Sequence, residues 1–511
     1  MTAMGRYGNH KSAPRYPHPF VNEVQLSSAQ KIRGVLLGAV LFPTRLALAA
    51  LFFLLMWPFA KLRLAGLSAK QRAEPVQGWR RWLLHPIILL LSRAVFFSLG
   101  FFWIRIKGRR ADPREAPMLA VAPHSSFLDI LILCPAALPT VVSRSENSSL
   151  PIIGALLEFN QSLVVSRKDP ESRRRCAAQL KERLTSNGRW PQMLLFPEGT
   201  TTNGQALIKF KLGAFMAGVP VQPVLLSYPN KLNTVCWTWK GTDWMEVVWH
   251  TASQLYTNIT VEYLPVYTPS QEEKANPTLY AANVQKLMAE KLGIPATDYV
   301  LEGKIPVQRM GCLSLPVEAP GRETLTLLQR AGLSTSSVES ALRRMMDRCQ
   351  SGRESCVGVE ELGSLLQLKD KRRAVDIFGL YSKEGRMDLR QLCLSVAAVS
   401  GLWSLESLIQ IAFTLFDGER KGSLTSGEFK ELLVALVGFS QNNTEELYSG
   451  ISSRGQPTQE DLRTLLTDHP TYQKLFREYL KPVDVSGHGV LGNGIKELVI
   501  NGSATSHKKD D

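Results

Sequence analysis

The sequence predicts an α/β domain whose mainly parallel sheet is covered by helices, with a membrane helical hairpin before it and an all-α domain after it. Between residues 113 and 305, short strand-like apolar runs alternate with helix-like stretches, which is typical of parallel sheets. Two long apolar stretches precede this region, and helical periodicity without strand-like runs follows it. A chain of 511 residues is long enough for such a series of domains.

The N-terminal segment, residues 1–33, is polar and rich in proline and histidine, so it has little apolar surface with which to build a core. An apolar stretch then runs from Gly34 to Ala60, interrupted only by Pro43 and Arg45. A signal peptide would lie nearer the terminus and end in small residues. A membrane helix fits better, because a span needs about 20 apolar residues, and we expect Pro43 and Pro58 to kink or end it.

A second apolar stretch, Trp82 to Ile104, is broken by His85, Pro86 and Arg93. One interpretation is a buried helix of the soluble domain, since a charge at the centre of a bilayer is costly. The interpretation we favour is a helical hairpin that enters the membrane from the cytosolic side, with tryptophan and basic residues at the interface. Residues 34–112 are therefore predicted to anchor the chain to a membrane.

The central region, residues 113–305, carries the predicted sheet. Active sites of such sheets gather at the carboxyl ends of the strands. The strand-like runs are Met118–Val121, Thr140–Val142, Ser162–Val165, Met193–Phe196, Val221–Leu226 and Ile259–Tyr263, and the helix-like stretches are Phe127–Cys134, Leu150–Leu157, Ser172–Ser186 and Leu207–Ala217.

Two motifs at strand ends point to proton abstraction from an alcohol. His124 and Asp129 lie five residues apart just after the first run, and a carboxylate that holds one imidazole nitrogen leaves the other free to act as a base. Ser125 or Ser126 would cap the short helix that follows. A motif of this length also arises by chance, so its weight comes from Glu198-Gly199-Thr200, which follows a later strand-like run.

Candidate cations for a phosphate group lie nearby in the sequence. Arg167 closes another strand-like run, and a guanidinium can hold a phosphate through two parallel hydrogen bonds. Lys209 and Lys211 follow Thr200 on the next segment. We take Lys209 as a candidate substrate-binding residue and Lys211 as a solvated surface charge.

The formal net charge of +15 indicates anionic partners. The basic residues cluster beside the apolar stretches, which favours a membrane surface over nucleic acid, and no nucleic-acid-binding signature is visible. The seven cysteines are scattered and odd in number, without the close pairs of a zinc site, so we expect reduced thiols in a reducing compartment. The basic clusters are Lys61 and Arg63, Arg80 and Arg81, and Arg105, Lys107, Arg109 and Arg110.

These motifs resemble the glycerolipid acyltransferase family. The histidine–aspartate motif, Arg167, Glu198-Gly199-Thr200 and Val219–Pro223 fall in the order of that family's four sequence blocks, over residues 117 to about 301. The resemblance is to its lysophosphatidylcholine acyltransferase branch. The residues that carry the likeness to the branch are Phe196–Thr200, Lys209–Lys211, Gly213–Phe215 and Tyr228–Leu232.

The resemblance implies a membrane enzyme with acyl-CoA as co-substrate and no metal or redox cofactor. It implies His124 as general base, Asp129 as its orienting partner, and Arg167, Glu198-Gly199-Thr200 as the groups that bind the acyl acceptor. The implied reaction moves a fatty acyl group from acyl-CoA to the free hydroxyl of lysophosphatidylethanolamine or lysophosphatidylcholine, in phospholipid synthesis and remodelling.

Two other functions stay open at this point. One is a 1-acylglycerol-3-phosphate acyltransferase, which would use the same motifs. The other is a catalytically dead, membrane-tethered adaptor that works through its C-terminal domain. The sequence does not decide the preferred headgroup, the acyl chain, the number of membrane spans or the oligomeric state.

The C-terminal region, residues 306–482, contains a stretch with the shape of an EF-hand, Leu415–Phe429. Gly422 and Glu428 stand at loop positions six and twelve, but Lys421 replaces an oxygen ligand at position five. The loop expected to pair with it, an upstream loop around Gly385, has Leu380 and Gln391 where the essential carboxylates belong. We therefore expect a degenerate EF-hand-like domain in which calcium binding is unlikely.

The tail, residues 483–511, is rich in glycine, serine and polar residues, which predicts disorder. Lys508 and Lys509 stand third and fourth from the end and resemble a dilysine retrieval signal. We therefore expect an endoplasmic reticulum membrane protein with its active site and C-terminus on the cytosolic side.

Overall fold

The computed structural model describes residues 18–480 apart from 23, 25, 167–168, 303–304, 352–353, 369, 383–384, 442 and 452–454. The chain divides into two units, Met1–Gln308 and Arg309–Asp511. The division falls within strand β11 (Ile305–Met310), close to the domain boundary predicted between residues 305 and 306.

A seven-stranded sheet forms the centre of the first unit, with the order β2-β9-β7-β3-β6-β4-β5. Neighbouring strands are parallel except for β7 and β9, so the prediction of a mainly parallel sheet is confirmed. All six predicted strands are present, and β2 is an addition. The strands are β2 (Ile104–Lys107), β3 (Met118–Ala122), β4 (Thr140–Arg144), β5 (Leu163–Val165), β6 (Met193–Leu195), β7 (Val221–Ser227) and β9 (Ile259–Tyr263).

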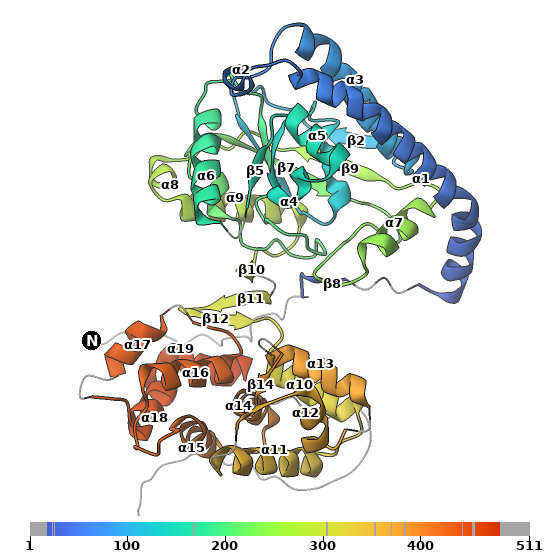
Figure 1. Cartoon of the computed structure of the whole chain (residues 1–511). Helices are drawn as coiled ribbons and strands as arrows, with labels where there is room; N and C mark the ends of the chain where they lie inside the picture. Colours follow the sequence, from blue (N-terminus) through green and yellow to red (C-terminus); the bar gives the residue numbers. More distant parts are fainter. Residues whose placement is uncertain are drawn as a thin grey trace, which may run out of the picture. The chain divides into compact units, whose positions relative to one another are not determined.

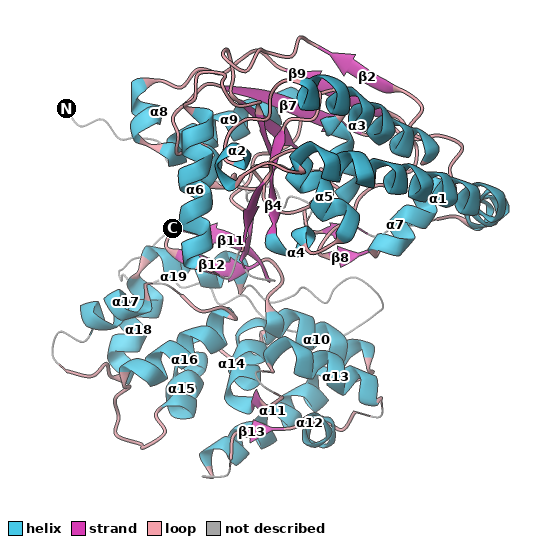
Figure 2. Cartoon of the chain, turned by 45° about the horizontal axis from the view of Figure 1, so that its top comes forward, coloured by secondary structure: helices cyan, strands magenta, loops and turns pink. Residues whose placement is uncertain are grey.

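Helices cover both faces of the sheet (Figure 1). Because side chains alternate along a strand, Leu119 and Val121 of β3 pack toward one face while Met118 and Ala120 pack toward the other. Figure 2 shows α6 on one side of the strands and α5 on the other. One face is covered by α1 (Ser28–Leu64), α3 (Trp79–Ser98), α5 (Pro151–Phe159) and α7 (Trp244–Ala252), and the other by α6 (Pro170–Leu184) and α9 (Pro277–Leu292).

Helices α1 and α3 correspond to the two predicted membrane segments, and both are long and apolar enough to cross a bilayer. Helix α1 begins earlier than predicted, at Ser28, where Ser27 and Gln30 form a capping box. Pro43 and Pro58 lie inside α1 and do not end it, so of the two expected outcomes, a kink or an end, the end is excluded. Packing against α3 and the sheet offsets the backbone hydrogen bond that each proline removes.

Two arginines of these helices, one in each, point toward the sheet domain. The guanidinium of Arg45 donates to the carbonyl oxygens of Ala252 and Leu255, at 2.9 and 2.7 Å, and that of Arg93 donates to two carbonyls of the following loop. Large apolar side chains lie on the exposed side, among them Leu54, Trp82 and Leu90. Each helix is thus packed on the sheet domain along one side and bare and apolar along the other. The packed side fits the interpretation of helices that belong to the domain, and entry into a membrane stays a prediction.

Two predicted helices turn out differently. Residues 207–217 form no helix apart from one short 3₁₀ turn, Leu212–Ala214, because the backbone of this segment is bonded elsewhere. The N–H groups of Leu207 and Lys209 donate to Pro295 and Tyr299, which keeps the segment extended. The stretch after His124 is a 3₁₀ helix, η1 (Phe127–Leu133), rather than an α-helix.

Short elements complete the first unit. Strand β1 pairs with β8, so part of the N-terminal segment predicted to lack packed structure is bound to the domain, and Phe20 beside it is fully buried. These elements are β1 (Val21–Asn22), α2 (Ala69–Arg72), α4 (Ser145–Ser148), β8 (Lys240–Gly241), α8 (Gln271–Ala275) and β10 (Val300–Glu302).

The second unit is almost entirely helical, as predicted, with β12 (Leu313–Pro316) leading into it. A two-residue strand after α11, β13 (Cys356–Val357), pairs with β14 (Met387–Asp388) after α13. The helices are α10 (Pro320–Arg330), α11 (Thr335–Gln350), α12 (Val359–Leu365), α13 (Lys371–Tyr381), α14 (Leu389–Ser400), α15 (Leu405–Phe416), α16 (Ser426–Val437), α17 (Thr444–Ile451), α18 (Gln459–Asp468) and α19 (Pro470–Lys474), with a π-helical turn at Leu475–Tyr479.

The loop between α15 and α16 contacts a different partner from the one expected. The N–H of Leu424 donates to the carbonyl of Pro457, in the loop that leads into α18. The loop around Gly385, which the sequence suggested as its partner, pairs instead with the loop after α11. The helix–loop–helix units are therefore coupled as consecutive pairs.

Candidate active site

The two sequence motifs meet at the carboxyl ends of neighbouring strands. Strand β3 ends at Ala122, two residues before His124, and the parallel strand β6 ends at Leu195, three residues before Glu198. The N–H of Thr202 donates to the carbonyl of His124 at 2.7 Å, which ties the two loops together. The site therefore lies in the crevice where parallel sheets usually place their ligands.

The carboxylate of Asp129 is the centre of the site. It is fully buried and accepts four hydrogen bonds. Oδ2 accepts from the backbone N–H groups of Ser125 (2.6 Å) and Ser126 (2.9 Å) and lies 2.8 Å from Nδ1 of His124, and Oδ1 accepts from the hydroxyl of Tyr228 at 2.6 Å. The buried charge is thus fully hydrogen-bonded, as a buried carboxylate requires.

This arrangement sets the proton on the histidine. Because an ionised carboxylate can only accept hydrogen bonds, Nδ1 of His124 must carry the hydrogen, and the lone pair is left on Nε2. The His124 side chain keeps 20% of its surface exposed, whereas Asp129 keeps none. The base is therefore accessible to a ligand while its partner is closed off.

Two residues of the site were not predicted from the sequence. Tyr228 comes from the end of β7, 99 residues after Asp129, and burial and the neighbouring carboxylate raise its pKa well above the ordinary value, so its hydroxyl stays protonated and can donate. The ring of Phe196 stacks on His124 with 4.1 Å between ring centres. Tyr228 sits inside a motif that carries the family resemblance, and that was the only signal in the sequence.

Glu198 is buried completely and bonds to the protein's own backbone. Its two carboxylate oxygens accept from the N–H groups of His124 (2.6 Å) and Ile208 (3.2 Å). Burial raises the pKa of Glu198 to about 8, against the opposing effect of these two hydrogen bonds. These contacts favour a role for Glu198 in positioning the His124 backbone rather than in contacting the acyl acceptor.

The residues after Glu198 form an open part of the site. Gly199 has a φ of +68°, and a Cβ there would lie 3.1 Å from the side chain of Lys211, so glycine is needed for both the conformation and the approach. Thr200 and Lys209 are half-buried. The stem of Lys211, taken from the sequence as a surface charge, covers Gly199 and so belongs to this surface. Arg167 lies outside the described residues.

The fold and site define an acyltransferase. A family model described as "Acyltransferase" matches residues 103–227, which include His124, Ser125, Ser126 and Asp129 and end one residue before Tyr228. Curated relatives extend the match over almost the whole chain, as follows.

The human protein named lysophospholipid acyltransferase LPCAT4 is 44% identical over 93% of this chain and 91% of its own length. Human lysophosphatidylcholine acyltransferase 2 is 40% identical over 91% of this chain and 86% of its own, and human lysophosphatidylcholine acyltransferase 1 is 36% identical over 92% and 88%. The chain belongs to the lysophospholipid acyltransferase family.

A solved structure, the 1-acyl-sn-glycerophosphate acyltransferase PlsC from Thermotoga maritima, also matches. It is 16% identical and covers 52% of this chain and 96% of its own, with a TM-score of 0.34. A score this low does not bear on the fold.

Replacing Tyr228 by phenylalanine is expected to lower kcat about tenfold with little change in KM, because a hydrogen bond to a charged group contributes about 1.5 kcal/mol or more. Steady-state acyl transfer by the purified protein measures both constants. Tyr256→Phe, at a tyrosine that is 52% exposed, is the matched control and should leave both unchanged. A raised KM with unchanged kcat would show that Tyr228 serves substrate binding instead.

Proposed function

We propose that the protein transfers a fatty acyl group from acyl-CoA to the free hydroxyl of a lysophospholipid, with lysophosphatidylethanolamine and lysophosphatidylcholine as acceptors. The observation that carries this proposal is a partly exposed His124 whose Nδ1 is held by Asp129, in a chain whose relatives are named as acyltransferases of lysophospholipids and of lysophosphatidylcholine. The products would be diacyl phospholipids, which places the reaction in phospholipid synthesis and remodelling.

The reaction needs no covalent intermediate on the enzyme. Nε2 of His124 takes the proton of the acceptor hydroxyl as the oxygen attacks the thioester carbonyl carbon. The new C–O bond forms, the C–S bond breaks, and the thiolate of coenzyme A leaves and takes the proton back from the imidazolium. Asp129 stabilises that imidazolium while it exists, and no metal or redox cofactor takes part in these steps.

The acceptor phosphate would lie on the open side of the site. Gly199, Thr200 and Lys209 offer a close backbone approach, a hydroxyl and an ammonium, and Arg167 would add a guanidinium. The same groups would suit lysophosphatidic acid. The alternative function, a 1-acylglycerol-3-phosphate acyltransferase, therefore differs from the proposed one only in the acceptor that the enzyme prefers. The complete hydrogen bonding of Asp129 argues against a catalytically dead adaptor.

Membrane attachment follows from the exposed apolar sides of α1 and α3. We propose that these sides embed in the bilayer while the opposite sides hold the sheet domain, so that the acceptor reaches His124 without leaving the membrane surface. The endoplasmic reticulum and a cytosolic active site remain the proposed location, supported by the unpaired cysteines. The dilysine pair that also supports it lies outside the described residues.

Replacing His124 by alanine is expected to lower acyl transfer by about 10²–10⁴-fold, the range typical for loss of a general base. The assay uses purified protein with acyl-CoA and a panel of lysophosphatidylethanolamine, lysophosphatidylcholine and lysophosphatidic acid. His250→Ala, in α7, is the control and should retain full activity. Normal turnover by the His124 variant would refute the mechanism, and activity with lysophosphatidic acid alone would refute the proposed acceptors.

We propose that the C-terminal unit is a set of degenerate EF-hand-like pairs that act without calcium. The loop between α15 and α16 is the best candidate for an ion, since Asp417 and Glu428 stand at its first and last ligand positions. However, Lys421 occupies position five, and its ammonium pairs with Glu419, a ligand candidate at position three. This pairing raises the pKa of Lys421, so the positive charge persists and opposes a cation.

Calcium from 0.1 to about 100 µM, a range that covers sensor affinities, is expected to leave activity unchanged relative to a chelator. Calorimetric titration of the full-length protein checks the binding directly. A saturable heat at micromolar calcium that disappears in Glu428→Gln would contradict the proposal. It would also restore a role for this unit as a calcium sensor.

A further inference from the structure

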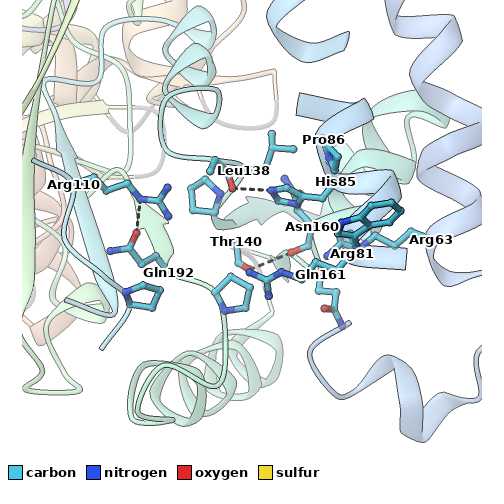
Figure 3. Close-up of a pocket in the computed structure, with 15 residues that line it drawn as sticks. Arg63, Arg81, His85, Pro86, Arg110, Leu138, Thr140, Asn160, Gln161 and Gln192 are labelled. Atoms are coloured by element: carbon cyan, nitrogen blue, oxygen red, sulfur yellow. Dashed lines mark hydrogen bonds between the residues drawn. The ribbon is translucent and has the colours of Figure 1, made fainter. Parts of the chain in front are cut away.

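A pocket separate from the active site lies at the amino ends of the parallel strands, whereas the active site lies at their carboxyl ends. It has a volume of about 350 Å³ and is lined by Thr140, the first residue of β4, and by Gln192, which directly precedes β6 (Figure 3). His124 and Glu198 follow the other ends of parallel strands. Because β3 has five residues at about 3.3 Å each, the two sites are separated by roughly 16 Å of sheet.

The charges that line this pocket are all positive. Arg63, Arg81 and Arg110 contribute guanidinium groups, and the lining contains no aspartate or glutamate. Figure 3 shows Arg63 and Arg81 on the side of the pocket opposite Arg110. Three like charges around one cavity repel one another, so an anion in the cavity would relieve the repulsion.

Arg63 gives the strongest sign of a missing ligand. Its residue is only 5% exposed, yet its Nε and Nη1 atoms are buried without a hydrogen-bond partner. The guanidinium lies over the ring of Phe159, 4.1 Å from its centre, a contact that satisfies none of its N–H groups. A buried charge needs an acceptor, and the pocket is the space in which one can be supplied.

Two residues that line the pocket also carry a buried side-chain acceptor without a partner. His85 lies with Nε2 at 3.2 Å from the carbonyl of Ala137, which makes Nε2 the donor and leaves Nδ1 as a buried lone pair without a partner. The side-chain oxygen of Asn160 is buried without a partner as well. The guanidinium groups of the arginines can donate hydrogen bonds to a phosphate, and the two acceptors can accept hydrogen bonds from hydroxyl groups on the same ligand.

The walls of the pocket are held rigidly. Arg110 donates from Nε to the side chain of Gln192 at 2.8 Å, and Gln192 donates in turn to two backbone carbonyls. Ala137, Leu138 and Gln161 all adopt positive φ, between 50° and 52°, a conformation that is strained for residues other than glycine and is concentrated at functional sites.

The source of the ligand follows from the residues around the pocket. Trp82, which lines the pocket, is 78% exposed, and Trp79 and Leu83 on the same turns of α3 are 54% and 44% exposed. Exposed tryptophans beside arginines are typical of the membrane interface. This step rests on the membrane attachment proposed above and is independent of the acyl-transfer chemistry.

We propose that this pocket binds the headgroup of an anionic membrane lipid that carries both a phosphate and hydroxyl groups, such as phosphatidylinositol. Arg63, Arg81 and Arg110 bind the phosphate, and His85 and Asn160 accept from the hydroxyls. The site is separate from the acceptor phosphate site beside Gly199, because it opens at the other end of the strands. A lipid bound here fixes the sheet domain against the bilayer.

Binding is tested with full-length protein in phosphatidylcholine nanodiscs, into which phosphatidylinositol is introduced at increasing mole fraction. The fraction of protein with bound phosphatidylinositol is read by native mass spectrometry. Arg81→Gln combined with Arg110→Gln is expected to weaken binding at least tenfold. Arg105→Gln combined with Lys107→Gln, which removes two exposed cations of β2 away from the pocket, is the matched charge control and should bind as the unaltered protein does.

The same variants are assayed for acyl transfer in nanodiscs of phosphatidylcholine alone, where each should keep its activity within about twofold. This readout separates a failure of this proposal from a failure of the catalytic one. Equal binding of phosphatidylinositol by all three proteins would overturn the site. Binding of soluble inositol 1-phosphate as tight as that of the lipid would overturn the assignment to a membrane lipid.

Discussion

The burial of one carboxylate governs the architecture of the catalytic centre. Asp129 has no exposed surface, so its charge can exist there only with a full set of donors. The donors come from a turn after β3, from the imidazole and from the end of β7. The order of the sheet, in which β3 lies between β6 and β7, is what brings these groups together.

The same rule explains why two long apolar helices carry arginines. Arg45 and Arg93 donate to backbone carbonyls of loops in the sheet domain, where the N–H groups that would otherwise face lipid find acceptors. The apolar side of each helix is then free to meet a bilayer. Arg63 departs from the rule, because its guanidinium has no acceptor for Nε or Nη1, and that departure marks the pocket at the amino ends of the strands.

The sequence was sufficient for the strands and for the dyad, because both depend on local patterns. Alternating runs predicted six strands, and the five-residue spacing of His124 and Asp129 brings them together through one turn. It was insufficient where distant partners decide. Residues 207–217 read as a helix but are held extended by Glu198 and by the segment around Pro295. Tyr228 reaches Asp129 only through the sheet.

Site roles were harder to predict than site positions. Glu198 was expected among the acceptor-binding groups; both of its carboxylate oxygens accept from backbone N–H groups in the buried interior, and its part in acceptor binding stays a prediction. The membrane segment was ambiguous for a related reason. The hydropathy of a segment describes how apolar its helix is. Which side of that helix packs on the domain depends on a sheet that forms from residues much later in the chain.

The central claim is that Asp129 acts through His124, by setting its tautomer and stabilising its charge. The most direct test is Asp129→Asn, which keeps the shape but not the charge, with kcat and KM measured for a lysophospholipid acceptor. We predict that kcat falls by about 10³-fold or more while KM stays within about twofold, since an uncharged partner no longer supports the imidazolium. An unchanged kcat with a raised KM would contradict the account and make Asp129 a binding residue.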